Sequence, residues 1–281
     1  HSTSRSPLLH LSFAQQRGSR IMISIKVENV SVHIDDILIL KNISANFTKS
    51  KFIGIVGPNG SGKTTLLRVL NGHITPTEGN VYVGSDPIAR LSAHQISKKI
   101  AVVPQNTMVS FDFTVREIVE MGRYPYNSRF GGFDSHSDLV TWAIKQTDLS
   151  ALSERTINSL SGGEKARVFI ARTLAQETPV LLLDEPIASL DFRHTSRILN
   201  LIKDQVDNFG KTAIVVLHDL ELAANFCDQL LLLSEGEILS MGAPESVLTR
   251  RNIQDAFHTD VSIETHPLTG LLTINVIDPT R

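Results

Sequence analysis

The stretch FIGIVGPNGSGKTT, residues 52–65, decides the fold of this chain. Its first five residues are almost entirely apolar, which is typical of a short strand buried on both faces of a sheet. The run Gly57-x4-Gly62-Lys63-Thr64 then matches the pattern of a phosphate-binding loop, and apolar residues at helical spacing follow it. A strand, a glycine-rich loop and a helix in this order predict a site for nucleotide phosphates.

Each residue type in this loop has a chemical reason. Glycines let the backbone curl, so that successive N–H groups point at phosphate oxygens beside the positive end of the helix dipole. Lys63 places a charge against the β- and γ-phosphates, and the Thr64 hydroxyl can bind Mg2+. The loop occurs in kinases, GTPases, helicases and transporters alike, so it predicts ATP binding but no reaction. The residues expected to hold ATP are Gly57, Pro58, Asn59, Gly60, Ser61, Gly62, Lys63, Thr64 and Thr65.

Composition narrows the classes of partner. The 281 residues include 27 basic and 29 acidic side chains, for a net charge of -2. There is no basic excess, so we expect no nucleic-acid partner. Cys227 is the one cysteine, which rules out an internal disulfide and fits a reducing cytosol. No run approaches the roughly 20 apolar residues that cross a bilayer.

The order of patterns along the chain predicts an α/β domain with an insertion. Residues 23–32 alternate apolar and polar side chains like a half-buried strand, and strand and helix patterns alternate again after residue 164. Between about 107 and 158 the pattern is helical, with a capping box at Thr114–Glu117. Residues 1–21 lack the hydrophobic core of a signal peptide, and we interpret them as a disordered or artificial extension.

Two carboxylates end the apolar run Val180–Leu183. Asp184 can hold Mg2+ through water, and Glu185 can orient or deprotonate an attacking water. An acidic pair at the end of a strand can also be a solvated turn. Beside a phosphate-binding loop, the catalytic interpretation is favoured.

A second anion site is predicted at Leu160–Glu164, with the sequence LSGGE. Ser161 and two glycines at the start of a helix present free N–H groups to a phosphate. A head-to-tail dimer would use both sites, with each ATP held between the phosphate loop of one chain and Ser161–Gly163 of the other.

The LSGGE run resembles the signature motif of ABC transporters, and the chain resembles their ATP-binding subunits over residues 22–258. The resemblance implies an α/β fold: a P-loop NTPase core with an antiparallel β subdomain and an inserted α-helical subdomain at about 107–158. Residues 259–281 are expected to form a C-terminal β hairpin or tail.

The resemblance also implies roles for single residues. Gln105 resembles the glutamine that contacts Mg2+ and senses the permease, Ser189–Asp191 resembles the D-loop, and His218 resembles the switch histidine that contacts the γ-phosphate. The implied catalytic residues are Lys63, Glu185 and His218, the implied metal ligands are Thr64, Gln105 and Asp184, and Gln105, Ser161, Gly162 and Gly163 join the loop in holding ATP.

Three positions depart from the family pattern. The aromatic residue that usually stacks on adenine is replaced by His33 or Ile34, Glu164 stands where Gln is common, and Ile187 stands where Thr is usual. None of these changes removes a predicted catalytic group, which argues against a regulator that binds nucleotide without hydrolysing it.

Because no membrane span is visible, we expect a separate permease, as in bacterial importers, with this chain as a homodimer on the cytoplasmic face of the cell membrane and a substrate-binding protein as an indirect partner. The run Met121–Tyr126 (MGRYPY), together with residues 217–224 and 266–270, resembles the subfamily that imports ferric siderophores, haem and cobalamin. A ferric siderophore is the first choice. Haem or cobalamin comes next, then another importer cargo such as polar amino acids or phosphate, and last a soluble ABC ATPase acting on ribosomes or DNA.

Overall fold

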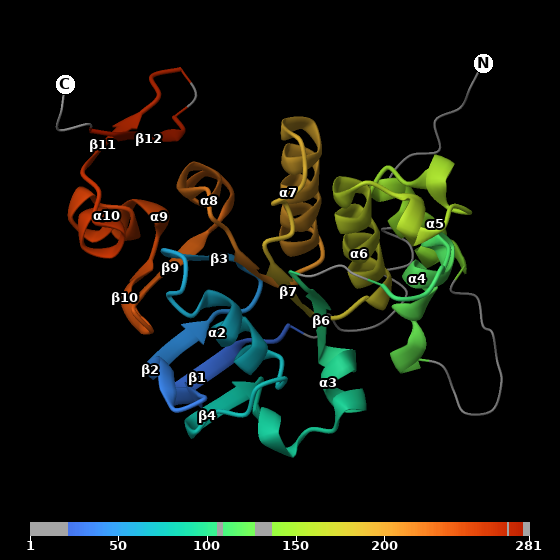
Figure 1. Ribbon diagram of the computed structural model, residues 1–281, viewed down its shortest axis with the longest axis horizontal. Helices are drawn as coiled ribbons and strands as arrows, with labels where there is room; N and C mark the ends of the chain where they lie inside the picture. The colour runs from blue at the N-terminus through green and yellow to red at the C-terminus, as the bar shows by residue number, and fades with distance from the viewer. Residues whose placement is uncertain (1–21, 106–108, 127–136, 269, 278–281) are drawn as a thin grey trace.

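The computed structural model describes residues 22–105, 109–126, 137–268 and 270–277 (Figure 1). The expected extension 1–21 lies outside the described residues, as do two parts of the helical insertion, 106–108 and 127–136. None of the described helices is long and apolar enough to cross a membrane.

A six-stranded sheet forms the centre of the molecule, with strand order β10-β9-β3-β8-β7-β6. β9, β3, β8, β7 and β6 run parallel, and β10 is antiparallel to β9. Every residue of β3, β7 and β8 is buried, which explains their continuous apolar runs. The strands are β3 (Phe52–Val56), β6 (Ile100–Val103), β7 (Val180–Asp184), β8 (Thr212–Val216), β9 (Gln229–Ser234) and β10 (Glu237–Gly242).

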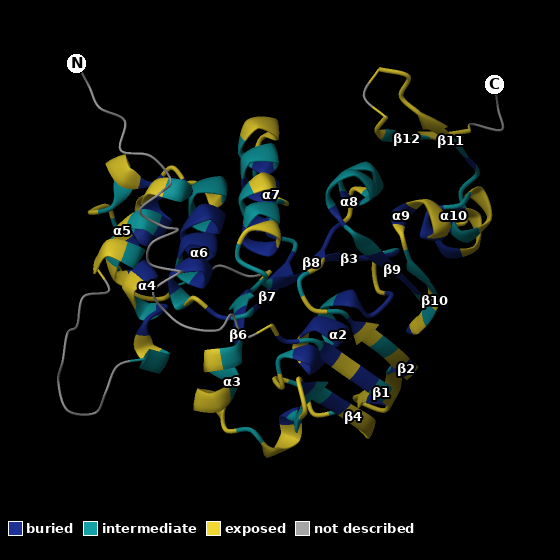
Figure 2. Ribbon diagram, turned by 180° about the vertical axis from the view of Figure 1, so that it is seen from behind, coloured by how far each residue is buried: buried dark blue, intermediate teal, exposed yellow. Residues whose placement is uncertain are grey.

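The two faces of this sheet pack against different layers. Along β3, Phe52 and Val56 join the hydrophobic cluster that holds α6, α7 and α8, whereas Ile53 and Ile55 join the cluster that holds α2 and the antiparallel sheet. This is the period of two that a strand imposes on its side chains. Figure 2 shows the central strands as the buried layer. The helices are α2 (Lys63–Leu70), α6 (Gly162–Gln176), α7 (Phe192–Asp207) and α8 (Leu220–Phe226).

A second sheet of four strands, in the order β2-β1-β4-β5, is entirely antiparallel. In β1 the side chains of Ile25, Val27, Val30 and Val32 are buried, so one face of this sheet covers the core beside α2. The strands are β1 (Ile25–Ile34), β2 (Ile37–Phe47), β4 (Glu78–Val83) and β5 (Asp86–Pro87).

A helical lobe stands to one side of the central sheet, at the right of Figure 1. α4 begins at the predicted capping box, in which the Thr114 hydroxyl accepts from the Glu117 N–H and the Glu117 carboxylate accepts from the Thr114 N–H. α4 and α5 both pack against α6. The lobe contains α4 (Val115–Met121) and α5 (Ser137–Gln146), with short 3-10 turns at Tyr124–Tyr126, Ser150–Leu152 and Ile157–Ser159. A 3-10 turn at Ile88–Arg90 and α3 (Ala93–Lys99) come earlier, between β5 and β6.

The C-terminal part adds α9 (Pro244–Val247), α10 (Arg250–Phe257) and a hairpin of β11 (Val261–Thr265) and β12 (Leu272–Val276). Side chains of α8 complete hydrogen bonds along β12, because Glu221 accepts from the Ile274 N–H and Asn225 pairs with Leu272. The hairpin is thereby attached to the helix that follows His218.

The predicted fold class is confirmed, although three helices were not foreseen. α3 has no buried residue and therefore no apolar stripe in its sequence. α9 and α10 are short, with four and eight residues. α7 begins at Phe192, because the Asp191 side chain caps it by accepting from the His194 N–H.

Candidate nucleotide site

The predicted site residues other than Ser161–Gly163 lie at or just beyond the carboxyl ends of neighbouring parallel strands. The phosphate loop follows β3, Glu185 follows β7, His218 comes two residues after β8, and Gln105 comes two residues after β6. Since these strands run parallel, their carboxyl ends meet at one edge of the sheet, which is where ligands bind in open α/β sheets. Tertiary structure thus brings together residues far apart in the sequence.

The shape of the loop depends on glycine at two positions. Gly57 has φ 150°, and a Cβ there would lie 2.0 Å from the carbonyl oxygen of Leu233. Gly62 has φ 102°, and its Cβ would lie 2.7 Å from Leu40 Cδ2. Larger residues would meet both a strained backbone and the atoms of β2 and β9. The loop is therefore clamped between neighbouring elements.

Lys63 is buried within this loop. Its side chain is only 5% exposed, and its ammonium donates to the carbonyl oxygens of Gly57 at 2.9 Å and Pro58 at 2.8 Å. Burial lowers the pKa of Lys63, although the charges of Glu185 and Asp184 partly oppose this. The Lys63 ammonium is poorly solvated and contacts neutral carbonyl oxygens of its loop. It is therefore suited to bind an anion such as phosphate.

Ser61 supports the same interpretation. Its side chain is 2% exposed, and its hydroxyl has no hydrogen-bond partner among the residues that the structure describes. A buried hydroxyl without a partner is costly. In this position, inside the curled loop, a phosphate oxygen would satisfy it, so the residues present fit a nucleotide phosphate.

Thr64 and Asp184 form the candidate metal position. The Thr64 hydroxyl donates to Asp184 Oδ1 at 3.2 Å, and Asp184 is 4% exposed. Burial raises the pKa of Asp184, against the opposing effect of the Thr64 hydrogen bond. Among the described residues, no group of three or more His, Cys, Asp or Glu could hold a metal. The oxygens of Thr64 and Asp184 are of the kind that Mg2+ prefers, since this ion binds few protein ligands and takes the rest from phosphate and water.

Glu185 and His218 are in direct contact. His218 Nε2 lies 2.6 Å from Glu185 Oε1, with the histidine donating to the carboxylate. Glu185 has φ 51°, a left-handed conformation that is unfavourable for a residue with a long side chain. Its side chain is 15% exposed, whereas that of His218 is 44% exposed. The strained backbone holds the carboxylate at the strand end, where the histidine reaches it.

Gln105 is exposed, two residues beyond the end of β6. The strand before it is held by α6, because Arg172 and Thr173 both donate to the Val102 carbonyl oxygen. The position of Gln105 therefore depends on how α6 packs against β6.

The LSGGE run begins α6, as predicted. Ser161 caps the helix, with its hydroxyl accepting from the Glu164 N–H while the Glu164 carboxylate accepts from the Ser161 N–H at 2.8 Å. These hydrogen bonds lower the pKa of Glu164. Ser161 and Gly162 are exposed. Gly163 packs so closely that its Cβ would lie 2.9 Å from the Ser189 carbonyl oxygen, so the signature and D-loop segments lie side by side.

The structure also shows the environment of the residues that depart from the family pattern. Ile34 is 40% exposed at the end of β1, and Ile187 packs against the main hydrophobic cluster. Glu164 acts in a capping box, where Glu and Gln are equivalent. Two features were missed by the sequence analysis: the contact of Glu185 with His218 and the unpaired Ser61 hydroxyl. Neither leaves a signal in the order of residues.

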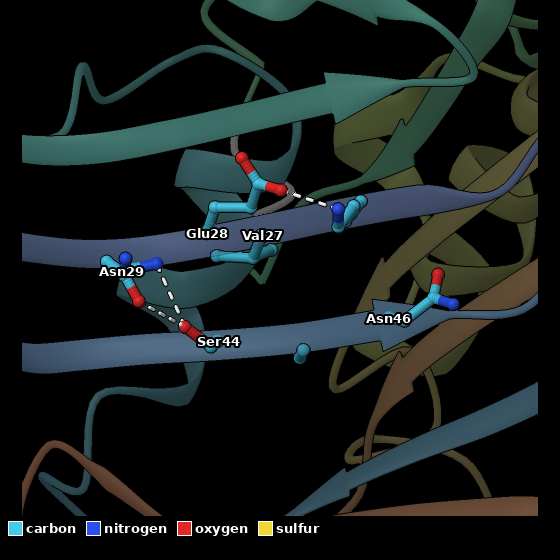
Figure 3. Close-up of a pocket in the computed structure, with 7 residues that line it drawn as sticks. Val27, Glu28, Asn29, Ser44 and Asn46 are labelled. Carbon is cyan, nitrogen blue, oxygen red and sulfur yellow. Dashed lines mark hydrogen bonds and ion pairs between the residues drawn. The ribbon is translucent and has the colours of Figure 1, made fainter.

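A shallow hollow on β1 and β2, shown in Figure 3, is separate from the candidate nucleotide site. Its polar side chains pair with one another: Asn29 with Ser44 at 2.9 Å, and Glu28 with Lys26 at 2.5 Å. It contains none of the predicted site residues.

Comparison with known proteins agrees with this geometry. The sequence model of the ABC transporter family matches residues 40–188. A cobalamin import ATP-binding protein of Halobacterium salinarum is 45% identical over 251 residues, which cover 89% of this chain and 63% of that protein's length. A hemin import ATP-binding protein of Thermobifida fusca is 41% identical over 233 residues, covering 83% of this chain and 81% of that protein.

A solved structure extends the comparison to the fold. A dimeric bacterial ABC transporter cassette superposes with a TM-score of 0.72 at 30% identity, covering 78% of this chain and 98% of that chain. The family predicted from the motifs is thus confirmed by sequence and by fold: this chain belongs to the ABC transporter family.

Proposed function

We propose that this chain binds and hydrolyses ATP as the motor subunit of an importer for a chelated metal. The observation that carries the proposal is the contact of Glu185 with His218 at the same sheet edge as the phosphate loop. A carboxylate held by a histidine beside a phosphate site is suited to activating a water.

The phosphate loop would bind the nucleotide with its own groups. Lys63 would exchange the carbonyl oxygens of Gly57 and Pro58 for β- and γ-phosphate oxygens, and the Ser61 hydroxyl would gain a partner. Thr64 and Asp184, with Gln105 beyond β6, would hold Mg2+, which when bound neutralises charge on the phosphate oxygens. Burial disfavours the charged forms of both Lys63 and Asp184. The negative phosphates would stabilise the Lys63 ammonium, and Mg2+ would stabilise the Asp184 carboxylate.

Glu185 would orient and deprotonate the attacking water, and His218 would hold the Glu185 carboxylate and then contact the γ-phosphate. The charge that develops on the phosphate is stabilised mainly by groups already in place, so the reaction depends on positioning and electrostatics. The left-handed backbone at Glu185 fits such a preorganised group.

The second half of each site would come from a second copy of the chain. Ser161 and Gly162 are exposed at the N-terminus of α6, where the Gly162 N–H would reach a phosphate bound by a partner's loop. The dimeric structure of a related cassette supports this arrangement. The functional unit would therefore be a homodimer.

The dimer would act on the cytoplasmic face of the cell membrane, beneath permease subunits, with a substrate-binding protein delivering the cargo to them. The permease would contact the groove between α3, the end of α4 and α6. The cargo would be a metal chelate, since the two relatives described above are named for cobalamin and hemin import, and the MGRYPY run resembles the group that also imports ferric siderophores. Ferric siderophore remains the first candidate.

The variant Glu185→Gln tests the reaction. It removes the base but keeps the shape, so ATP affinity should stay within about twofold while turnover falls at least about 100-fold. ATP should also trap a dimer that light scattering detects. If this variant hydrolyses ATP at the normal rate, Glu185 is not the base.

Cargo is tested separately. A deletion strain complemented with this chain and its permease should regain growth on one chelate among ferric siderophore, haem and cobalamin. The Glu185→Gln chain should restore none of them, and growth restored on none by the native chain would contradict the import proposal.

A further inference from the structure

The MGRYPY run at the end of α4 has a place in the fold that nucleotide chemistry does not explain. Gly122 packs directly on α6, where a Cβ would lie 2.4 Å from the carbonyl oxygen of Arg172. Any larger residue would push α4 away from α6, because the atom it meets is backbone. The glycine therefore sets the closest approach of the two helices.

Arg123 follows at once and is 4% exposed. Its guanidinium donates to the carbonyl oxygen of Ala175 at 2.7 Å and lies 3.6 Å from the Glu177 carboxylate. It also stacks on the Tyr126 ring, 4.4 Å from the ring centre. Carbonyl oxygens in the last turn of a helix need donors, and a cation there also complements the helix dipole. Arg123 thus caps the C-terminus of α6 from the neighbouring helix.

The same end of α6 is fastened to the core from its other side. Gln176 donates to the carbonyl oxygens of Ser97 at 2.7 Å and Ile100 at 3.2 Å, and Arg172 donates to Val102 at 3.2 Å. α6 is therefore held between the lobe, through Arg123, and the strand that leads to Gln105. Its opposite end carries Ser161 and Gly162.

A groove runs over this junction. One wall is formed by Met121, Tyr124 and Pro125 of the MGRYPY run, and the other by α3. Arg172 and Gln176 of α6 line it as well. A protein segment bound in the groove would contact both the end of α4 and α6, close to the point where Arg123 joins them. Because α6 is one continuous helix of 15 residues, movement at that end would be carried to Ser161.

We propose that Arg123 is a positioning residue that couples occupancy of this groove by the permease to the placement of the signature loop at the other end of α6. The inference rests on the proposed function, since it assumes a permease in the groove and a partner's ATP at Ser161. The contacts of Arg123 described above are with Ala175, Glu177 and Tyr126, at the end of α6 opposite Ser161.

The test compares two rates for the full chain: ATP hydrolysis by the isolated chain, and hydrolysis by the complex with its permease in lipid nanodiscs. Arg123→Met keeps the bulk of the side chain but removes its donors and charge. The stimulated rate should fall about tenfold, in the range of allosteric coupling energies, while the isolated rate stays within about twofold. Arg123→Lys keeps the charge and should restore part of the stimulation.

The matched control is Arg116→Met on α4, the helix that ends just before Arg123. Arg116 is 35% exposed and pairs with Glu120 and Glu154 at the surface, so its loss should change neither rate by more than about twofold. Glu177→Gln provides a second variant, which keeps the Arg123 side chain but removes the carboxylate beside its guanidinium. It should lower stimulation in the same direction as Arg123→Met.

The outcomes separate the two proposals. If the native chain is not stimulated by its permease, the proposed function fails. If the native chain is stimulated and Arg123→Met matches it, or loses isolated and stimulated rates in equal proportion, the coupling role of Arg123 is wrong. Should Arg123→Met not fold, full stimulation of Glu177→Gln would overturn the inference, and reduced stimulation would support it.

Discussion

The phosphate loop after β3 and the signature loop before α6 are both glycine-rich helix N-termini, yet they are built differently. The first is enclosed: Gly57 and Gly62 touch neighbouring strands, and Lys63 is 5% exposed. The second is open, with Ser161 and Gly162 exposed, and its capping box pairs the N–H groups of Ser161 and Glu164. The first loop therefore contains a buried cation and a buried hydroxyl suited to an anion, whereas the second loop presents its groups at the surface.

The largest effect on ATP binding is expected from a substitution in the enclosed phosphate loop. Lys63→Met should weaken ATP binding at least about 100-fold, because a charged group that contacts phosphate is lost. The fold should survive, since burial already disfavours the charged lysine in the absence of ligand. Isothermal titration with ATP and thermal unfolding of the free chain measure the two quantities. ATP binding of native strength would contradict the assignment of this loop.

A smaller effect should come from the open loop. Ser161→Ala removes a helix cap worth about 1 kcal/mol and one group offered to the partner's ATP. Binding of ATP to the single chain should not change, whereas turnover should fall about tenfold.

The chain offers a matched control for this change. Ser92 caps α3 through the same kind of capping box, with Gln95. Ser92→Ala should lower the unfolding temperature about as much as Ser161→Ala but leave turnover intact. Equal turnover in the two variants would mean that Ser161 only caps its helix.

The smallest effect concerns Glu164. Glu164→Gln should keep turnover within about twofold, because Gln also completes a capping box. Hydrogen bonds from Ser161 lower the pKa of Glu164 below its ordinary value of 4.5, so the carboxylate stabilises the folded state at neutral pH. That stabilisation should be lost as the pH falls through the lowered pKa, and the glutamine variant should not show this loss. Thermal unfolding between pH 7 and strongly acidic pH would reveal identical profiles if the capping role were wrong.

Much of this could be predicted because the decisive contacts are local. The pattern of strand, loop and helix around Gly57–Thr65, the LSGGE run and the capping box at Thr114 each lie within a few residues, so their sequence patterns predict their structures. α3 could not be predicted in this way, since none of its residues is buried and no apolar stripe marks it. The domain boundaries and the roles of the site residues stay predictions.

The sequence by itself determined the residue types of the site and the strands that carry them, because apolar periodicity and glycine positions are patterns of a few neighbouring residues. Only the tertiary structure decided which of these residues meet. Glu185 and His218 lie 33 positions apart, and they touch because β7 and β8 are hydrogen-bonded neighbours running in the same direction. Arg123 and Glu177 meet because α4 and α6 pack closely at Gly122. Such pairings depend on strand order and helix packing, which no local pattern contains.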